Sequence, residues 1–110
     1  MNKYIFDIQE LSIKDFDNKK LKKKYGGKFG IIEFYNNGEK CHKIQSTMIR
    51  IARIFKKNGK IIYAINTLKN KKILDILNIK KVPSLFILLP KSNLINMNID
   101  NYSEENIYKQ

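Results

Sequence analysis

A nearly continuous apolar run at residues 29–35 and a second strand-like segment at 60–66, apolar from 61 to 65, constrain the fold of this chain most strongly, because they flank a stretch with helical spacing. Only Gly30 and Glu33 interrupt the first run, a pattern typical of a central strand buried on both faces. Between the runs, apolar residues recur at helical intervals from Cys41 to residue 57, and Asn58-Gly59 ends the pattern. The sequence therefore predicts a strand, a helix that starts at the cysteine, and a second strand.

The flanking segments add further elements. Residues 4–8 alternate as in a short strand, and Ser12, with Asp15 three residues later, predicts the N-cap of a polar helix ending near Tyr25. Beyond the second run we expect a short helix at 73–77, a strand at 84–89, and a turn at 90–93 into a strand at 94–99, the two strands forming an antiparallel hairpin. A last helical segment is expected over 103–110. This order predicts an α/β domain: a mixed central β-sheet with helices on both faces.

The length of 110 residues suits a single domain spanning residues 1–110. No apolar run approaches the roughly 18 to 20 residues that cross a membrane, and the N-terminal segment, broken by Asp7 and Glu10, lacks a signal-peptide core. We therefore expect a cytoplasmic protein if the chain is complete, although its ending inside a helical segment suggests a truncated or excised domain. The single cysteine, Cys41, excludes an internal disulfide and a multi-cysteine zinc site. No cofactor is expected.

The net charge of +12 admits two explanations. Only Arg50 and Arg53 among the 22 basic residues are arginine, the residue favoured for bidentate contacts to phosphate and bases. A lysine excess of this kind fits a compositional bias. The densest cluster, residues 19–24, is either a solvated face of the first helix or a patch for nucleic acid or an acidic partner.

Four segments, taken in order, carry a resemblance. The first segment is Leu11-Ser12 together with Phe16-Asp17, and the second is Ile32-Glu33-Phe34-Tyr35. The third is Gly38-Glu39-Lys40-Cys41, and the fourth is Val82-Pro83-Ser84. Together they resemble the thioredoxin-like domains of protein disulfide isomerases, which have Cys-Gly-His-Cys in the third position and a cis-proline segment in the fourth. The resemblance covers nearly the whole chain and implies a thioredoxin fold with one of its two active-site sulfurs missing.

In that family the first cysteine is the exposed nucleophile and the second is the shielded resolving thiol, so Cys41 has two possible registers. As the second cysteine it lies 42 residues before Pro83, near the family value, with Ile44 on a buried apolar position of the family. As the first cysteine it requires a loop two residues longer and a shorter separation from Pro83. We favour the second register, which places Gly38 where the nucleophile would lie.

The missing sulfur bears on the chemistry, because disulfide exchange needs a second thiol to release the mixed disulfide. A lone Cys41 at a helix start, beside Lys40 and Lys43, could still act as a monothiol that pairs with glutathione. The alternative is a buried, inert thiol. Exposure of the sulfur separates these two interpretations.

Two other positions are candidates for function. Glu33 in a buried strand must be neutral or paired; the resemblance implies a proton acceptor for the resolving thiol, and pairing with a lysine is the alternative. For Val82 and Pro83 the resemblance implies a cis peptide beside a groove for extended peptide, whereas the plain interpretation is a trans proline at a strand start.

We therefore carry three functions forward. The preferred one is a redox-degenerate thioredoxin-like domain that binds peptide or protein partners through Cys41, Pro83 and the neighbouring residues Gly38, Glu39, Lys40 and Val82. The second is a thiol-disulfide oxidoreductase or isomerase that works through Cys41 as its one cysteine, with Glu33 as a second catalytic residue. The third is a basic structural component of a ribonucleoprotein or membrane-associated assembly. The resemblance would place an excised domain in the endoplasmic reticulum or secretory pathway.

Overall fold

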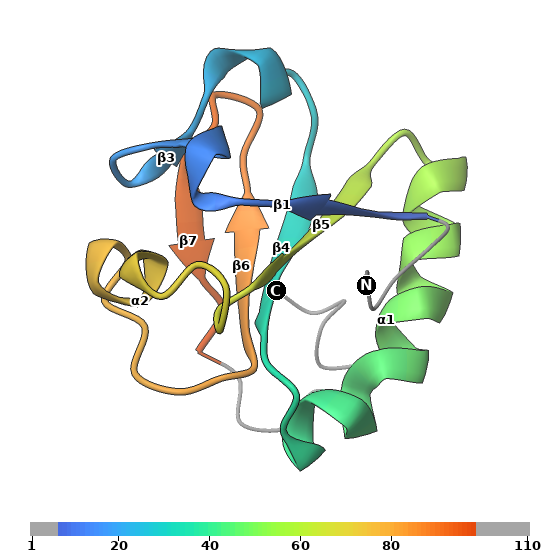
Figure 1. The fold of residues 1–110 in the computed structure, drawn as a ribbon. Helices are drawn as coiled ribbons and strands as arrows, with labels where there is room; N and C mark the ends of the chain where they lie inside the picture. Colours follow the sequence, from blue (N-terminus) through green and yellow to red (C-terminus); the bar gives the residue numbers. More distant parts are fainter. Residues whose placement is uncertain (1–6, 99–110) are drawn as a thin grey trace.

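A computed structural model describes residues 7–98 of the chain. Its elements are β1 (Ile8–Leu11), the 3-10 turn η1 (Ile13–Asp15), β2 (Phe16–Asp17), β3 (Lys20–Leu21), the 3-10 turn η2 (Lys23–Tyr25), β4 (Gly30–Tyr35), α1 (Glu39–Lys57), β5 (Ile61–Asn66), α2 (Lys72–Ile76), β6 (Ser84–Leu88) and β7 (Leu94–Asn96). Five strands form one sheet in the order β1-β5-β4-β6-β7 (Figure 1). Because β5 runs parallel to β1 and β4, whereas β6 is antiparallel to β4 and β7, the sheet is mixed, as predicted.

Strand β4 is the centre of the sheet, and all six of its residues are buried. Its apolar side chains alternate between the two covered faces, which explains the uninterrupted run in the sequence. Gly30 is required at its start, because a Cβ there would lie 2.3 Å from the carbonyl oxygen of Ile61 on β5. The prediction of a buried central strand is confirmed.

Helix α1 begins at Glu39, two residues before the predicted start, with Gly38 as its N-cap. Glu39 in the first turn and two lysines in the last turn complement the helix dipole. Gly59, with φ of +72°, adopts the left-handed conformation that follows the helix end. The helix buries one stripe of side chains against the sheet: Cys41, Ile44, Met48, Ile51 and Ala52.

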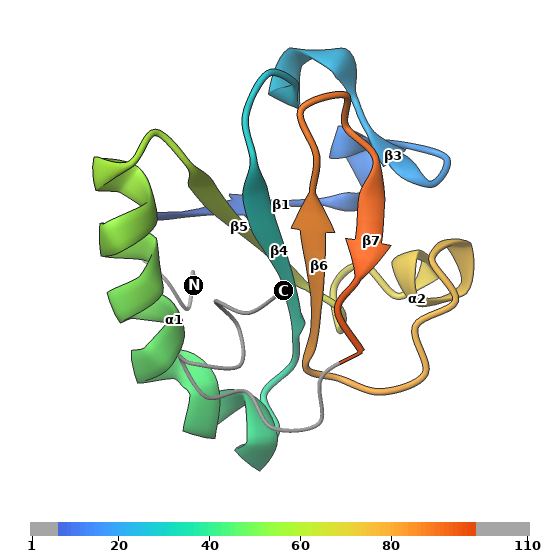
Figure 2. The same cartoon turned by 180° about the vertical axis from the view of Figure 1, so that it is seen from behind.

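Two apolar clusters lie on opposite sides of the sheet. On the face covered by α1, here the α1 face, the helix packs against residues that include Ile31, Tyr35, Ala64 and Leu85. On the other, the α2 face, Ile73 of α2 packs with residues that include Leu11, Phe16, Leu21, Ile32, Phe34, Ile65 and Phe86. Figures 1 and 2 show α1 and α2 on opposite sides in both views, so the prediction of helices on both faces is confirmed.

The predicted first helix, Ser12 to Tyr25, is wrong. Ser12 does form a capping box with Asp15, but the cap closes only the single turn η1. The chain then makes the hairpin β2–β3, in which Phe16 lies opposite Leu21 and Asn18 has a left-handed φ of 56°. A hairpin buries Phe16 and Leu21 side by side, whereas a helix would place them on different sides. The lysines of residues 19–24 therefore lie exposed on a hairpin and a 3-10 turn, not on a helix.

This hairpin region is attached to the turn between β6 and β7. The backbone N–H of Leu21 donates to the carbonyl of Ser92 at 3.4 Å, and that of Gly27 donates to Pro90 at 2.7 Å. Segments far apart in the sequence thereby close one end of the molecule, the upper end in Figure 1.

The remaining predicted elements differ from the structure mainly at their ends. Strand β1 runs from Ile8 to Leu11 and therefore overlaps the expected strand 4–8 only at Ile8; residues 4–6 lie outside the described part of the chain. The hairpin of β6 and β7 is confirmed, with β7 ending at Asn96. The predicted segment 103–110 lies outside the described residues. Within residues 7–98, none of the helices has the length and apolar character needed to cross a bilayer.

Candidate functional site

Three segments of the predicted site meet at one end of the sheet. Strand β4 ends at Tyr35, α1 begins three residues after Asn36, and the segment before β6 contains Pro83. Since Phe34 pairs with Ser84 in the antiparallel register, the next residues outward, Tyr35 and Pro83, are neighbours. Figures 1 and 2 both place the start of α1 and the start of β6 at the same end.

The side chain of Cys41 is completely buried, with 0% exposure, inside the first turn of α1. The backbone N–H of Asn36 donates to the Cys41 Sγ at 3.3 Å, and the thiol donates to the Asn36 Oδ1 at 3.4 Å. The same Oδ1 accepts the backbone N–H of Gly38 at 2.7 Å. Asn36 therefore holds both the thiol and the residue that caps the helix.

This geometry agrees with the shielded register of Cys41. A nucleophilic thiol must be reachable by a disulfide, and the Cys41 sulfur has no exposed surface. In contrast to Cys41, the preceding residues Gly38, Glu39 and Lys40 are all exposed. The Lys43 ammonium, expected to activate the thiol, lies 3.8 Å from the Glu39 carboxylate.

Glu33 is fully buried at the middle of β4. Sheet register places Ala64 of β5 on one side of it and Leu85 of β6 on the other, and both belong to the cluster under α1. The strand alternation puts Glu33 on the α1 face, the face that also carries Cys41. The structure thus brings the two residues predicted as catalytic to the same side of the sheet.

A second carboxylate lies in the same row. Glu10 of β1 pairs with Ala64, so that Glu10, Ala64 and Glu33 follow one another across three strands. The Tyr35 hydroxyl donates to the Glu10 Oε1 at 2.5 Å. Burial, this hydrogen bond and the charges of Glu10 and Glu33 raise the pKa of Tyr35 above its usual value. Tyr35 therefore stays a neutral hydrogen-bond donor.

The predicted proline marker has the backbone expected of it: the Val82–Pro83 peptide is cis, and Pro83 is buried. Val82 is half-buried and packs against both apolar clusters, including the one that contains Cys41. Just beyond the proline, the Ser84 Oγ donates to the Lys81 carbonyl at 2.5 Å, which fixes the segment leading into β6.

The sequence reasoning missed Asn36 and Glu10. For Asn36 a signal was available, since the motif Asn36-Asn37-Gly38 after a strand is typical of a turn closed by an asparagine side chain. For Glu10 there was none, because its position beside Ala64 and near Tyr35 depends on a pairing between β1 and β5 that no local pattern specifies.

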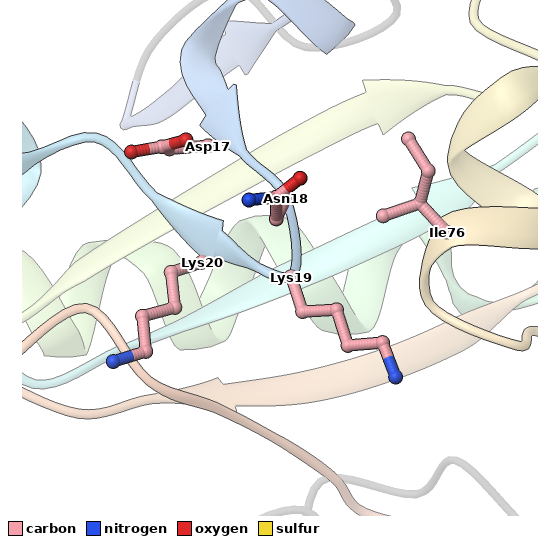
Figure 3. Close-up of a pocket in the computed structure, with 5 residues that line it drawn as sticks. All are labelled: Asp17, Asn18, Lys19, Lys20 and Ile76. Atoms are coloured by element: carbon pink, nitrogen blue, oxygen red, sulfur yellow. The ribbon is translucent and has the colours of Figure 1, made fainter.

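Two open cavities lie on the α2 side of the molecule. One, of about 480 Å³, adjoins Pro83 and is lined by Leu77, Asn78, Lys80, Lys81, Ser84, Asn96 and Asn98; we name it the Lys80 cleft. The other, of about 610 Å³, lies between the β2–β3 hairpin and α2, with Asp17, Lys19 and Lys20 from the hairpin and Ile76 from α2 (Figure 3). In Figure 3 the Lys19 and Lys20 side chains extend from the hairpin in different directions. Neither cavity was predicted.

Ligands for a metal ion do not gather in the described part of the chain. Among residues 7–98 there is no group of three or more His, Cys, Asp or Glu side chains placed to hold a metal ion. The polar groups that the structure places on the α1 face include the Cys41 thiol, the buried Glu33 carboxylate and the Glu10 carboxylate, which accepts the Tyr35 hydroxyl.

Comparison with known proteins identifies the fold. No protein-family model and no curated protein sequence matches the chain. Among solved structures, the J-Trx1 fragment of ERdj5 matches with a TM-score of 0.73 and 22% identity over 94% of this chain. A second structure, ERdj5 form II, matches with a TM-score of 0.75 and 20% identity, again over 94% of this chain. The chain spans 49% of the first protein and 13% of the second. It therefore has a thioredoxin-like fold, as the sequence resemblance implied.

Proposed function

We propose that this chain is a redox-degenerate thioredoxin-like domain that binds an extended peptide or a protein segment at the surface around Cys41 and Pro83. The observation that carries the proposal is the complete burial of the Cys41 thiol behind Asn36, with Gly38 at the helix start where the resembling family has its nucleophile. The binding surface comprises Gly38, Glu39, Lys40 and Val82 beside Pro83.

Burial of the thiol argues against catalysis by Cys41 alone. Disulfide exchange proceeds by in-line attack of a thiolate on a disulfide sulfur, so the attacking sulfur must be both ionised and accessible. The Cys41 sulfur has no exposed surface, and the thiol donates a hydrogen bond to the Asn36 Oδ1. A monothiol enzyme would require the first turn of α1 to open before each reaction.

Hydrogen bonds that hold the backbone beneath this surface support a binding role. The Tyr35 carbonyl accepts hydrogen bonds from the Thr67 backbone N–H at 2.8 Å and from its hydroxyl at 3.0 Å. Asn36 ties the following turn to the helix start. A surface held in place before binding loses less conformational entropy when a peptide docks.

Two measurements test the two halves of this proposal. First, the native protein is incubated in glutathione disulfide and its intact mass is followed, with a denatured sample as control. We expect the native mass to stay constant while the denatured sample gains one glutathione. Rapid modification of the native protein would refute the redox-degenerate half and favour the monothiol enzyme.

Second, a panel of extended ten-residue peptides is added to ¹⁵N-labelled protein, and amide chemical shifts are followed by NMR. We expect the largest shifts at residues 36–41 and 81–84, and equal binding by Cys41→Ser, because no covalent step is involved. Shifts confined to the β2–β3 hairpin, or no shifts with any peptide of the panel, would contradict the binding half.

A further inference from the structure

The Lys80 cleft extends the binding surface to the other side of Pro83. Its walls come from three separate parts of the fold: the end of α2, the segment before β6, and the end of β7. At about 480 Å³ its volume falls within the range of roughly 300 to 1,000 Å³ that is usual for ligand sites. Lys81 and Ser84, which line the cleft, flank Val82 and Pro83 in the sequence, so the cleft adjoins the segment that contains the proline.

The lining is polar, and its charge has one sign. Leu77 is the one apolar residue among the described residues that line it; the others are two lysines, three asparagines and a serine. No aspartate or glutamate is among those residues. The hairpin cavity differs in this respect, because Asp17 lies there directly opposite Lys20 and offsets part of its charge. Among the described lining residues, the Lys80 cleft thus carries positive charge alone, whereas the hairpin cavity carries both signs.

Hydrogen bonds hold the cleft in shape. The Ser84 hydroxyl fixes the Lys81 carbonyl, and the Asn96 Oδ1 accepts the Asn98 backbone N–H at 2.8 Å. Asn78 and Asn98 both have left-handed φ values, 55° and 52°, so that the chain turns sharply on either side of the cleft. The two lysine side chains, both exposed, stand on this fixed frame.

The side chains select the kind of ligand. Lysine ammonium groups donate hydrogen bonds and attract carboxylates, whereas asparagine amides both donate to and accept from a peptide backbone. Single-stranded nucleic acid is bound where cations accompany aromatic rings that stack on bases, and the described lining has neither an aromatic residue nor an arginine. In the described sheet β7 is an edge strand, and Asn96 belongs to it. Extended peptides commonly align with such edges.

We propose that the Lys80 cleft recognises acidic side chains of the bound segment, so that the partner of this domain is an extended peptide with aspartate or glutamate next to the residues that contact Pro83. This proposal rests on the proposed function, because it assumes that a peptide lies at the proline. It adds the chemical class of the partner and names Lys80 and Lys81 as the residues that determine specificity.

The absence of tryptophan from the chain makes the test direct. Ten-residue peptides with one tryptophan and four glutamates are titrated with the full chain, and the tryptophan fluorescence anisotropy is followed at two salt concentrations. A matched peptide carries glutamine in place of each glutamate. We expect the acidic peptide to bind at least about 5-fold more tightly at low salt, with the advantage shrinking as salt screens the charges.

Two double variants with equal loss of charge locate the effect. Replacing Lys80 and Lys81 by glutamine should weaken binding of the acidic peptide by about 3- to 10-fold, since each exposed lysine adds a modest attraction. Replacing Lys19 and Lys20 by glutamine, in the hairpin cavity, should change it by less than about 2-fold. Both pairs are exposed, so neither change disturbs the core.

Other outcomes overturn the inference in distinguishable ways. Equal weakening in the two double variants would show attraction by net charge alone. Equal affinity for the glutamine peptide would refute the acidic preference while leaving the proposed function intact. Tighter binding of a single-stranded oligonucleotide of the same charge would assign the cleft to nucleic acid. If neither peptide binds, the proposed function fails together with this inference.

Discussion

The replacement of Asn36 by alanine tests how the Cys41 thiol is shielded. The Asn36 amide oxygen is the shared acceptor for the Gly38 backbone N–H at 2.7 Å and for the Cys41 thiol at 3.4 Å. Alanine removes this acceptor and leaves the backbone contact from the Asn36 N–H to the sulfur in place. The first turn of α1 should therefore open more often, without loss of the fold.

The magnitude follows from the two lost hydrogen bonds. A neutral hydrogen bond contributes about 0.5–1.5 kcal/mol, and the longer contact from the thiol adds a smaller amount, so the opening free energy should fall by roughly 1–2 kcal/mol. If the thiol reacts only from the opened state, its rate of modification rises by the corresponding Boltzmann factor. A change of 1.4 kcal/mol is tenfold, so we expect Cys41 to react about 5 to 30 times faster.

The assay is the rate at which an aromatic disulfide reagent labels Cys41 in native protein, followed by the absorbance of the released thiol. Asn37→Ala is the matched control, because Asn37 is the exposed neighbour of Asn36. We expect that control to react at the rate of the unmodified protein. Equal rates for the Asn36 variant and the control would refute the shielding role. Immediate labelling of the unmodified protein would refute the premise that the thiol is closed.

Three further predictions concern the missing sulfur, the core and the pH dependence. Gly38→Cys should allow an internal disulfide with Cys41, seen as a mass loss of about 2 Da on oxidation, and more readily in combination with Asn36→Ala, because a Cβ at Gly38 lies 2.8 Å from the Asn36 Oδ1. Met48→Ala, at a side chain with 0% exposure under α1, should lower the free energy of unfolding by about 2–5 kcal/mol in urea titrations. Tyr25 should stabilise the fold up to pH 10 and lose that effect as the pH rises to about 12, because its hydrogen bond to Asp15 raises the pKa of Tyr25 to about 12; Tyr25→Phe should flatten this part of the stability curve.

Each of these predictions has a contrary result. Gly38→Cys without any oxidised species would show that residues 38 and 41 are not placed as a redox pair. A change below about 1 kcal/mol for Met48→Ala would mean that α1 does not pack on the sheet as described. If the stability of Tyr25→Phe falls as steeply between pH 10 and 12 as that of the unmodified protein, the loss of stability comes from the lysines and not from Tyr25.

The sequence was sufficient for the centre of the sheet. Strand β4 and the helix after it could be predicted because a residue buried on both faces must be apolar, and because α1 buries one stripe at helical spacing. The hairpin β2–β3 could not, since Ser12 and Asp15 form a real capping box. A capping box marks where a helical turn starts but not how many turns follow. Here only one turn follows, and Phe16 then packs into the core cluster with Leu21.

The site was less open to prediction. The sequence left the exposure of Cys41 undecided, although the favoured register made it the shielded thiol with Ile44 on a buried position, and both side chains are buried in α1. The contact of Asn36 with the thiol depends on side-chain geometry across a turn, and the row from Glu10 to Glu33 depends on pairing of strands far apart in the sequence. Neither has a local pattern that a single sequence can reveal.

The hydrogen bonds between the β2–β3 region and the β6–β7 turn have a consequence for local unfolding. The backbone N–H groups of Leu21 and Gly27 donate hydrogen bonds to the carbonyls of Ser92 and Pro90, so unfolding of either segment breaks hydrogen bonds that the other segment needs. The two should therefore open as one cooperative unit, separate from the end that carries Cys41. Hydrogen exchange would show this as matched protection of the Leu21 and Gly27 amides, so that the basic end of the molecule loosens while the thiol stays closed.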